Sequence, residues 1–248
     1  LVGTIYPIFL EVITGAKISV GPPYFNQLII PFLIPFLFIM AIGPKLDWIK
    51  NKKFDAKLSK IILLIISIII SYLIAKNFNT QVLYSTLIIS SALFLFFVSI
   101  TDLQNTKLKL SQKISHSAFS ILIISIILNS LFSEEVSVNL KKGEEKQLSN
   151  YLLKFENISK MEIDNFTSLK AEIHVIHNDN KLKFYPELRL YKVPETITSE
   201  AAIKTSLFSD NLVVVNYLKD TNYLNIRYQK KPFMLLIWLS AIMLAVGG

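Results

Sequence analysis

The chain has 248 residues, of which 52% are hydrophobic, and its formal net charge is +8. Its mean hydropathy of +0.48 is too high for an ordinary soluble domain. The chain has no cysteine, which excludes structural disulfides, zinc–thiolate sites and a cysteine nucleophile among these residues.

The apolar residues form long runs separated by polar segments. A helix needs about 20 mostly apolar residues to cross a bilayer. Residues 1–132 are therefore predicted to be transmembrane, starting with the end of one apolar helix in residues 1–10. The complete spans are expected at about 27–44, 58–76, 82–102 and 114–132. A final apolar helix begins in residues 232–248, so we expect the chain to be a piece of a longer membrane protein.

The lysines predict how these spans are oriented. Six lysines lie between Lys45 and Lys60, and three more lie between residues 104 and 113. Basic residues at the ends of apolar spans mark the cytoplasmic side of a membrane. We therefore expect residues 15–26 and 133–231 on the outer side. A nucleic-acid-binding protein would instead carry its basic patch on a folded domain, so we expect no nucleic-acid partner.

The stretch GAKISVGPPYFN, from Gly15 to Asn26, is predicted to be a stiff outer loop. Pro22 and Pro23 restrict the backbone and remove two hydrogen-bond donors. Tyr24 has the amphipathic ring that is enriched at membrane interfaces. This loop either has a function of its own or is a plain turn between helices.

Residues 133–231 are predicted to fold as a small β-rich domain between two spans, on the extracytoplasmic side. Apolar and polar residues alternate there, which is typical of half-buried strands. The alternating apolar positions are Val136, Val138, Leu140, Leu169, Ala171, Ile173, Val175, Leu182, Phe184, Leu188, Leu190, Leu224, Ile226 and Tyr228. A turn is expected at Lys141–Glu144, and Pro186 indicates an edge position or a bulge. The segment TSEAAIKTSLFSD is predicted to be a short helix capped by Thr198 or Ser199.

The histidines are the main candidates for chemistry. His174 and His177 lie three positions apart on a predicted strand, where such residues point to opposite faces, so a shared metal is not expected. His116 lies near the start of the span 114–132, and ionisable residues inside spans are functional candidates. An imidazole there can bind haem iron, relay protons or hold a metal, or it can simply reach the nearby inner surface or hydrogen-bond to a neighbouring helix.

Lys113, Ser117 and Ser120 fall on the same helical face as His116, by their spacing of three, four and seven residues. The sequence contains no glycine-rich phosphate loop, HExxH motif, GxSxG motif or pair of carboxylates within a span. We therefore identify no catalytic residue of a hydrolase or an ATPase in this chain.

Four blocks of the sequence resemble the CcmF family of cytochrome c-type biogenesis proteins. They are GTIYPIFLEVITGAKISVGPPYFN (3–26), FYPELRLY (184–191), SEAAIKTSLFSDNLVVVN (199–216) and PFMLLIWLSAIMLAVGG (232–248). The blocks are long, occur in the same order as in the family and extend over the whole chain. The resemblance is therefore more specific than any single motif.

The resemblance implies the C-terminal part of the membrane component of a haem lyase. That family binds haem b through axial histidines on two membrane helices, and it supports attachment of substrate haem to the CxxCH motif of apocytochrome c. The motif S-H-S-A identifies His116 as one axial ligand, and so as the ligand of the haem iron, although Ala118 replaces a family glycine. Ser240 likewise stands where the family often has glycine. The second histidine and a Trp-rich segment are expected before Leu1, so we expect this piece alone to be inactive.

If the resemblance holds, the helical spacing and the place of the outer loop predict roles for residues near the two candidate sites. Lys113, Ser117 and Ser120 are expected to hydrogen-bond to the ligand or to a haem propionate. A wall beside an outer haem cavity is the role expected for Gly21, Pro22, Pro23, Tyr24 and Asn26. The expected partners are a haem chaperone, apocytochrome c, other maturation subunits and the lipid bilayer.

The expected location is the bacterial inner membrane, with an organellar inner membrane as the alternative. Two other functions are compatible with the residues. One is a multi-pass transporter or permease subunit with a periplasmic domain, because Pro31 and Pro35 interrupt the first complete span. The other is a non-catalytic assembly scaffold whose β-rich domain docks partner proteins.

Overall fold

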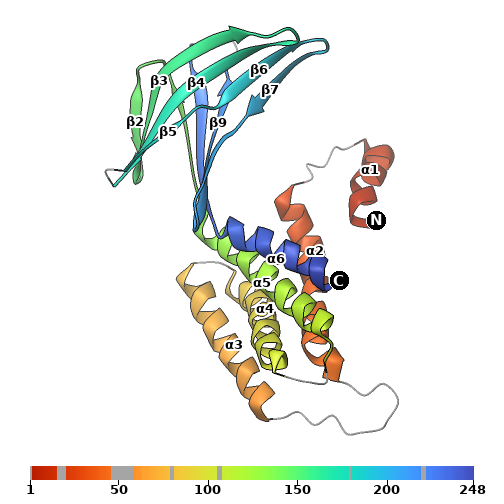
Figure 1. The fold of residues 1–248 in the computed structure, drawn as a ribbon. Coiled ribbons are helices and arrows are strands. Elements are labelled where there is room, and N and C mark those ends of the chain that lie inside the picture. Colours follow the sequence, from red (N-terminus) through yellow and green to blue (C-terminus); the bar gives the residue numbers. More distant parts are fainter. Residues whose placement is uncertain are drawn as a thin grey trace. The chain divides into compact units, whose positions relative to one another are not determined.

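The computed structural model describes residues 2–15, 21–45, 58–78, 81–104, 108–178, 180–218 and 222–248. The chain divides into two compact units (Figure 1). The helical unit comprises Leu1–Ile127 and Leu236–Gly248, and the β unit comprises Leu128–Leu235.

The apolar runs of the sequence form the helices of the helical unit. They are α1 (Val2–Thr14), α2 (Pro22–Ile42), α3 (Leu58–Asn77), α4 (Val82–Leu103), α5 (Leu110–Phe132) and α6 (Met234–Gly247), with a short 3₁₀ turn at Gly43–Lys45 after α2. Among the described residues, α2, α3, α4 and α5 are long and apolar enough to cross a membrane. The helices α2 and α5 begin earlier than the predicted spans. Together with the β unit, these helices confirm the predicted fold class.

Small residues allow α3 and α4 to pack closely. Ser67, Ser71 and Ala75 recur every fourth position on α3 and are fully buried, and α3 packs against α4. The Ser71 hydroxyl donates to the Ser67 carbonyl at 2.6 Å, and the Ser67 hydroxyl donates to the Leu63 carbonyl at 2.8 Å. Since these hydroxyls are satisfied within their own helix, they can be buried without a partner on α4.

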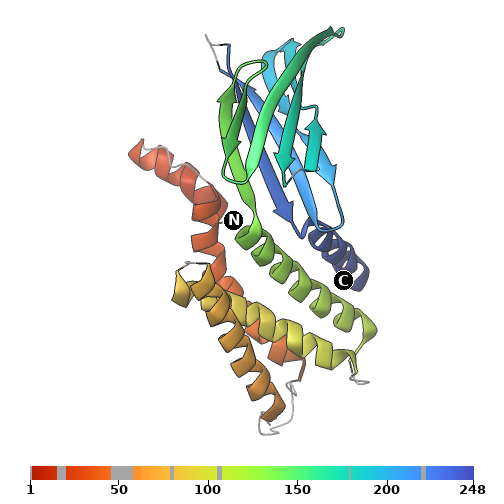
Figure 2. The same ribbon diagram turned by 90° about the vertical axis from the view of Figure 1, so that its left-hand side faces the viewer.

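The β unit consists of two antiparallel sheets (Figures 1 and 2). The four-stranded sheet has the order β1 (Glu134–Leu140), β10 (Leu224–Pro232), β9 (Ser209–Tyr217) and β8 (Ala202–Thr205). The other sheet has the order β2 (Glu145–Leu148), β3 (Tyr151–Glu162), β4 (Phe166–His177), β6 (Glu187–Lys192) and β7 (Glu195–Glu200), with β5 (Asn180–Phe184) also paired to β4. The turn predicted at Lys141–Glu144 is present, with Gly143 at φ +85° and the Glu144 N–H donating to the Lys141 carbonyl at 3.0 Å.

One apolar core lies between the two sheets. Its buried residues are Val138, Leu140, Tyr151, Leu153, Phe155, Ala171, Ile173, Val175, Phe184, Leu188, Val213, Val215, Leu224, Ile226 and Tyr228. Most of the alternating positions recognised in the sequence belong to this set. Antiparallel sheets that bury one face and expose the other produce that alternation.

The short helix predicted from TSEAAIKTSLFSD is wrong, because this segment forms β7 and β8. Ser199, a predicted helix cap, donates its hydroxyl to the Val215 carbonyl of β9 at 2.5 Å. Pairing of β7 with β6 and of β8 with β9 thus overrides the helical propensity of the local sequence.

Pro186 lies between β5 and β6, and both of these strands pair with β4. The register shows no inserted residue, because Phe184 is opposite Ile173 and Glu187 is opposite Lys170. The Pro186 carbonyl still accepts a hydrogen bond from the Ala171 N–H at 2.9 Å. Of the two alternatives, the edge position is correct and the bulge is not, since the described strand β5 pairs with β4 alone.

Candidate functional site

His116 lies on the second turn of α5 and is half-buried. The helix that carries it begins at Leu110, so His116 lies inside α5 and not at its N-terminus. Lys113, one turn earlier, is also half-buried, and its Nζ donates to the Leu103 carbonyl at 3.0 Å. Lys113 thus joins the start of α5 to the last residue of α4.

The two serines that share this helical face differ in their hydrogen bonds. Ser120 is fully buried, and its hydroxyl donates to the Ser117 carbonyl at 2.8 Å. The Ser117 Oγ is also buried, but it has no hydrogen-bond partner among the described residues. A buried hydroxyl without a partner costs free energy, which distinguishes Ser117 from Ser120.

The end of α6 lies very close to α5 (Figure 1), at Ser115, the residue before His116 in the sequence. A Cβ atom added to Gly247 would lie 2.7 Å from the Ser115 Oγ and 2.8 Å from the Ser115 backbone nitrogen. Since the backbone cannot move aside easily, only glycine allows this approach. Ala118, one turn along α5 from Ser115, is fully buried as well.

The predicted outer loop differs from the structure in its second half. Gly21 is the residue before α2, and Pro22, Pro23, Tyr24 and Asn26 belong to the first turns of that helix. Proline is accepted at the start of a helix because the first N–H groups have no partner within the helix. Tyr24 contacts Phe25 edge to face at 5.4 Å, and Asn26 is exposed. Residues 16–20 lie outside the described part of the chain.

His174 and His177 lie on opposite faces of β4, as predicted. His174 is 4% exposed on the outer face of its sheet, with its Nε2 at 2.9 Å from Glu172. His177 lies on the core side, where its ring stacks on Tyr151 at 4.6 Å and its Nδ1 is 2.9 Å from the Asn150 carbonyl. Each histidine therefore has its own protein partners.

The outer face of the larger sheet carries a polar groove that the sequence analysis missed. The groove has a volume of about 280 Å³ and is lined by Asn157, Ser159, Lys170, Glu172 and Tyr185. A β-bulge on β3, between Phe155 and Asn157, turns two successive residues toward this face. The interruption of the two-residue period in YLLKFENIS is the only signal of this bulge in the sequence.

Residues 131–232 match the model of a known family, described as the CcmF C-terminal β-sandwich. The whole chain is 29% identical, over 263 residues, to the cytochrome c-type biogenesis protein CcmF of Pseudomonas fluorescens, and the match covers 40% of that protein. It is 24% identical over 258 residues to CcmF of Escherichia coli K12, again covering 100% of this chain and 40% of the relative. The chain therefore spans about 40% of the length of these curated relatives.

A solved structure named cytochrome c haem lyase CcmF has the same fold. The TM-score is 0.75 at 14% identity, and the match covers 99% of this chain and 41% of the other. At this identity the similarity concerns the fold alone. By these matches, residues 131–232 are similar to the CcmF C-terminal β-sandwich, and the chain as a whole is similar to the C-terminal part of cytochrome c-type biogenesis proteins.

Proposed function

We propose that this chain is part of the membrane component of a cytochrome c maturation haem lyase, in which His116 binds the iron of haem b. The single observation that carries this proposal is a half-buried imidazole on a helix long enough to cross a membrane. Ionisable residues in such helices are rare and usually functional. Similarity to proteins named for cytochrome c biogenesis favours haem ligation among the roles open to an imidazole.

The residues near His116 fit a haem ligand site. The Ser117 Oγ is a buried polar atom without a partner among the described residues, and it is adjacent in sequence to the proposed ligand. Lys113 uses one of the three donors of its ammonium group on Leu103, which leaves donors for a carboxylate such as a haem propionate. The Ser120 hydroxyl bonds within its own helix, so we assign it no role toward haem.

In this proposal, the protein residues hold and orient the haem. The His116 imidazole binds the iron, α6 holds α5 in place through the close contact at Gly247, and Ser117 hydrogen-bonds near the ligand. Haem held in this way would supply electron-transfer chemistry. The second ligand would come from outside this chain.

The reaction that we propose for the whole protein joins substrate haem to the CxxCH thiols of apocytochrome c. Its partners would be a haem chaperone, apocytochrome c and the other maturation subunits. The lysine distribution supports placing the β unit on the outer side of the bacterial inner membrane. The absence of cysteine fits this reaction, because the reacting thiols belong to the apocytochrome.

Absorbance spectroscopy of the full-length protein in membranes or detergent tests the proposal. His116→Ala is expected to weaken the Soret band strongly, whereas the control His177→Ala, in the β unit, is expected to leave the band unchanged. An unchanged spectrum in His116→Ala would remove this residue from the site. A full-length protein with no Soret band at all would favour the transporter or scaffold function instead.

A further inference from the structure

The turn between β8 and β9 carries two large apolar residues at its tip. Leu207 is 68% exposed and Phe208 is 76% exposed. Glycine, proline, asparagine, aspartate and serine dominate such turns, so two adjacent large apolar residues are unusual there. Phe132, which is 47% exposed, and the half-buried Phe233 extend the apolar surface. We call these four residues the tip patch.

The turn that presents Leu207 and Phe208 is closed by its flanking serines. The Ser206 N–H and hydroxyl both donate to the Ser209 carbonyl, at 3.0 Å and 2.6 Å. The Ser209 N–H donates in return to the Ser206 hydroxyl at 3.2 Å. Because these bonds fix the turn, the two apolar side chains are held outward and do not fold back on the sandwich.

The tip patch lies beside the ends of the two helices that flank the β strands. The Phe233 N–H, immediately before α6, donates to the Phe208 carbonyl at 3.0 Å. The rings of Phe233 and Phe132, the last residue of α5, are 6.2 Å apart. The Asn129 side chain also donates to the Pro232 carbonyl at 2.6 Å. All of these residues belong to the β unit, so their arrangement is defined within that unit.

The position of the tip patch next to the ends of α5 and α6 indicates that lipid covers it. The helix α5 is long and apolar enough to cross a membrane, so its last residues must lie near the boundary between acyl chains and headgroups. Phe208 is hydrogen-bonded to Phe233, whose ring contacts Phe132 at the end of α5, so the turn lies next to this boundary. Exposed apolar side chains at that boundary are stabilised by lipid.

We propose that the β8–β9 tip inserts into the lipid interface and holds the β unit against the bilayer. The chain already joins the strands to α5 through Ser133 and to α6 through Phe233. The tip adds a non-covalent contact with the bilayer to these two connections. This inference does not depend on haem binding, and it holds or fails separately from the proposed function.

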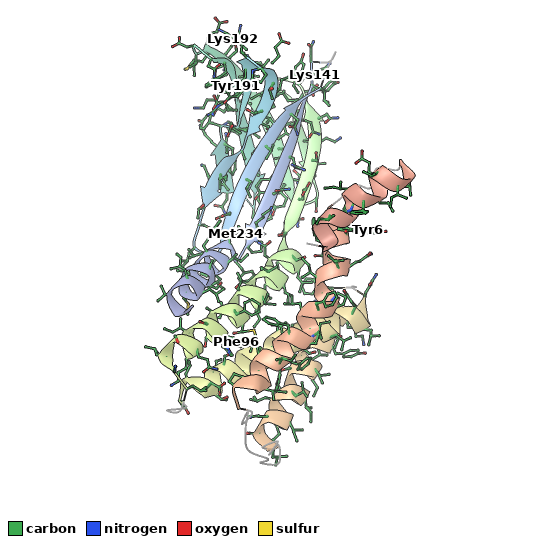
Figure 3. All side chains as sticks on the ribbon, turned by 90° about the vertical axis from the view of Figure 1, so that its right-hand side faces the viewer. Tyr6, Phe96, Lys141, Tyr191, Lys192 and Met234 are labelled. Atoms are coloured by element: carbon green, nitrogen blue, oxygen red, sulfur yellow. The ribbon has the colours of Figure 1, made fainter. Side chains whose placement is uncertain are left out.

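Lipid-dependent fluorescence quenching tests the proposal directly. These 248 residues contain no cysteine, so Phe208→Cys provides a single labelling site for an environment-sensitive fluorophore once any cysteine elsewhere in the full-length protein is replaced by serine. The labelled full-length protein is reconstituted in phosphatidylcholine vesicles that contain a nitroxide lipid. The matched control is Lys192→Cys, an exposed residue at the end of the β unit opposite Met234 (Figure 3).

We expect nitroxide lipid to quench the label at position 208 about threefold or more beyond the label at position 192, and iodide in the buffer to show the reverse order. Equal quenching at the two positions would overturn the proposal. Shielding of position 208 from both quenchers would also overturn it, because protein would then cover the tip. If circular dichroism shows that Phe208→Cys misfolds, Leu207→Cys gives the same comparison.

Discussion

The two units place polar and apolar residues in opposite ways. In the helical unit, Ser67 and Ser71 are fully buried, while Ile69 is 54% exposed. In the β unit, the core is apolar and the charged residues lie outside. The helical unit therefore suits lipid and would be unstable in water, whereas the β unit suits water and would be unstable in lipid.

The difference teaches how each unit is stabilised. Water drives the burial of apolar side chains, and this effect dominates the folding of the β unit. Lipid tails are as apolar as leucine, so helices in a membrane associate through close packing of small residues. The hydroxyls of Ser67 and Ser71 bond to carbonyls of their own helix, which allows serine in a place where the β unit uses valine or isoleucine.

The largest expected effect comes from the core of the β unit. Ile173 is fully buried between the sheets, so Ile173→Ala removes packing and leaves a cavity that costs about 2–5 kcal/mol in the free energy of unfolding. Denaturant unfolding followed by near-ultraviolet circular dichroism measures this loss. The control Ile197→Ala, at a position that is 54% exposed, should change stability by less than about 0.5 kcal/mol. Equal losses would show that the two-sheet core is not the source of stability.

Lysine substitutions at two equally exposed isoleucines, one in each unit, distinguish a lipid environment from water. Ile69 in the middle of α3 is 54% exposed and Ile203 on β8 is 56% exposed. Ile69→Lys is expected to cost about 2.5–3.5 kcal/mol in membrane insertion, because the charge enters the hydrocarbon region. Ile203→Lys should cost less than about 0.5 kcal/mol, because that side chain meets water. A membrane-insertion assay and an unfolding measurement give the two values, and similar small costs would contradict the lipid-facing assignment of α3.

A smaller effect is expected from alkaline pH on the β unit alone. Burial, and then the hydrogen bond to Glu134, raise the pKa of Tyr151, and burial raises the pKa of Tyr228 to about 12. An unfolded tyrosine loses its proton near pH 10, so stability is complete below that pH and falls as the pH rises above it. The Tyr151→Phe variant lacks this loss at position 151. The difference in unfolding free energy between the unsubstituted protein and the variant should therefore become smaller above pH 10. A constant difference, measured by urea unfolding from pH 8 to 11, would contradict this.

The sequence predicts an element well where the environment of its residues produces a regular pattern of apolar side chains. The spans were visible because most exposed residues of these helices are apolar, and β4 and β10 were visible because one face of each is buried. The segment TSEAAIKTSLFSD, residues 198–210, was wrongly predicted as a helix. Among the described strands, β8 pairs with β9 alone, and its apolar and polar residues alternate little. The strand β3 was not predicted, and the bulge between Phe155 and Asn157 interrupts its two-residue period.

The candidate site could be predicted only in part. The resemblance and the helical spacing identify His116 and its face, but helical spacing does not distinguish the satisfied hydroxyl of Ser120 from the unsatisfied one of Ser117. The contact between Gly247 and Ser115 joins residues more than a hundred positions apart, and no local pattern indicates it. Pro22 and Pro23 were predicted as a loop because two prolines restrict a backbone, although the same restriction suits the first turn of a helix.

The Soret absorbance of a His116→Gly variant of the full-length protein, measured with and without added imidazole, tests the central claim most directly. If His116 binds haem iron, the band should be lost in the variant and should return when imidazole occupies the vacated position. A variant that keeps the full band without imidazole would show that His116 is not the ligand.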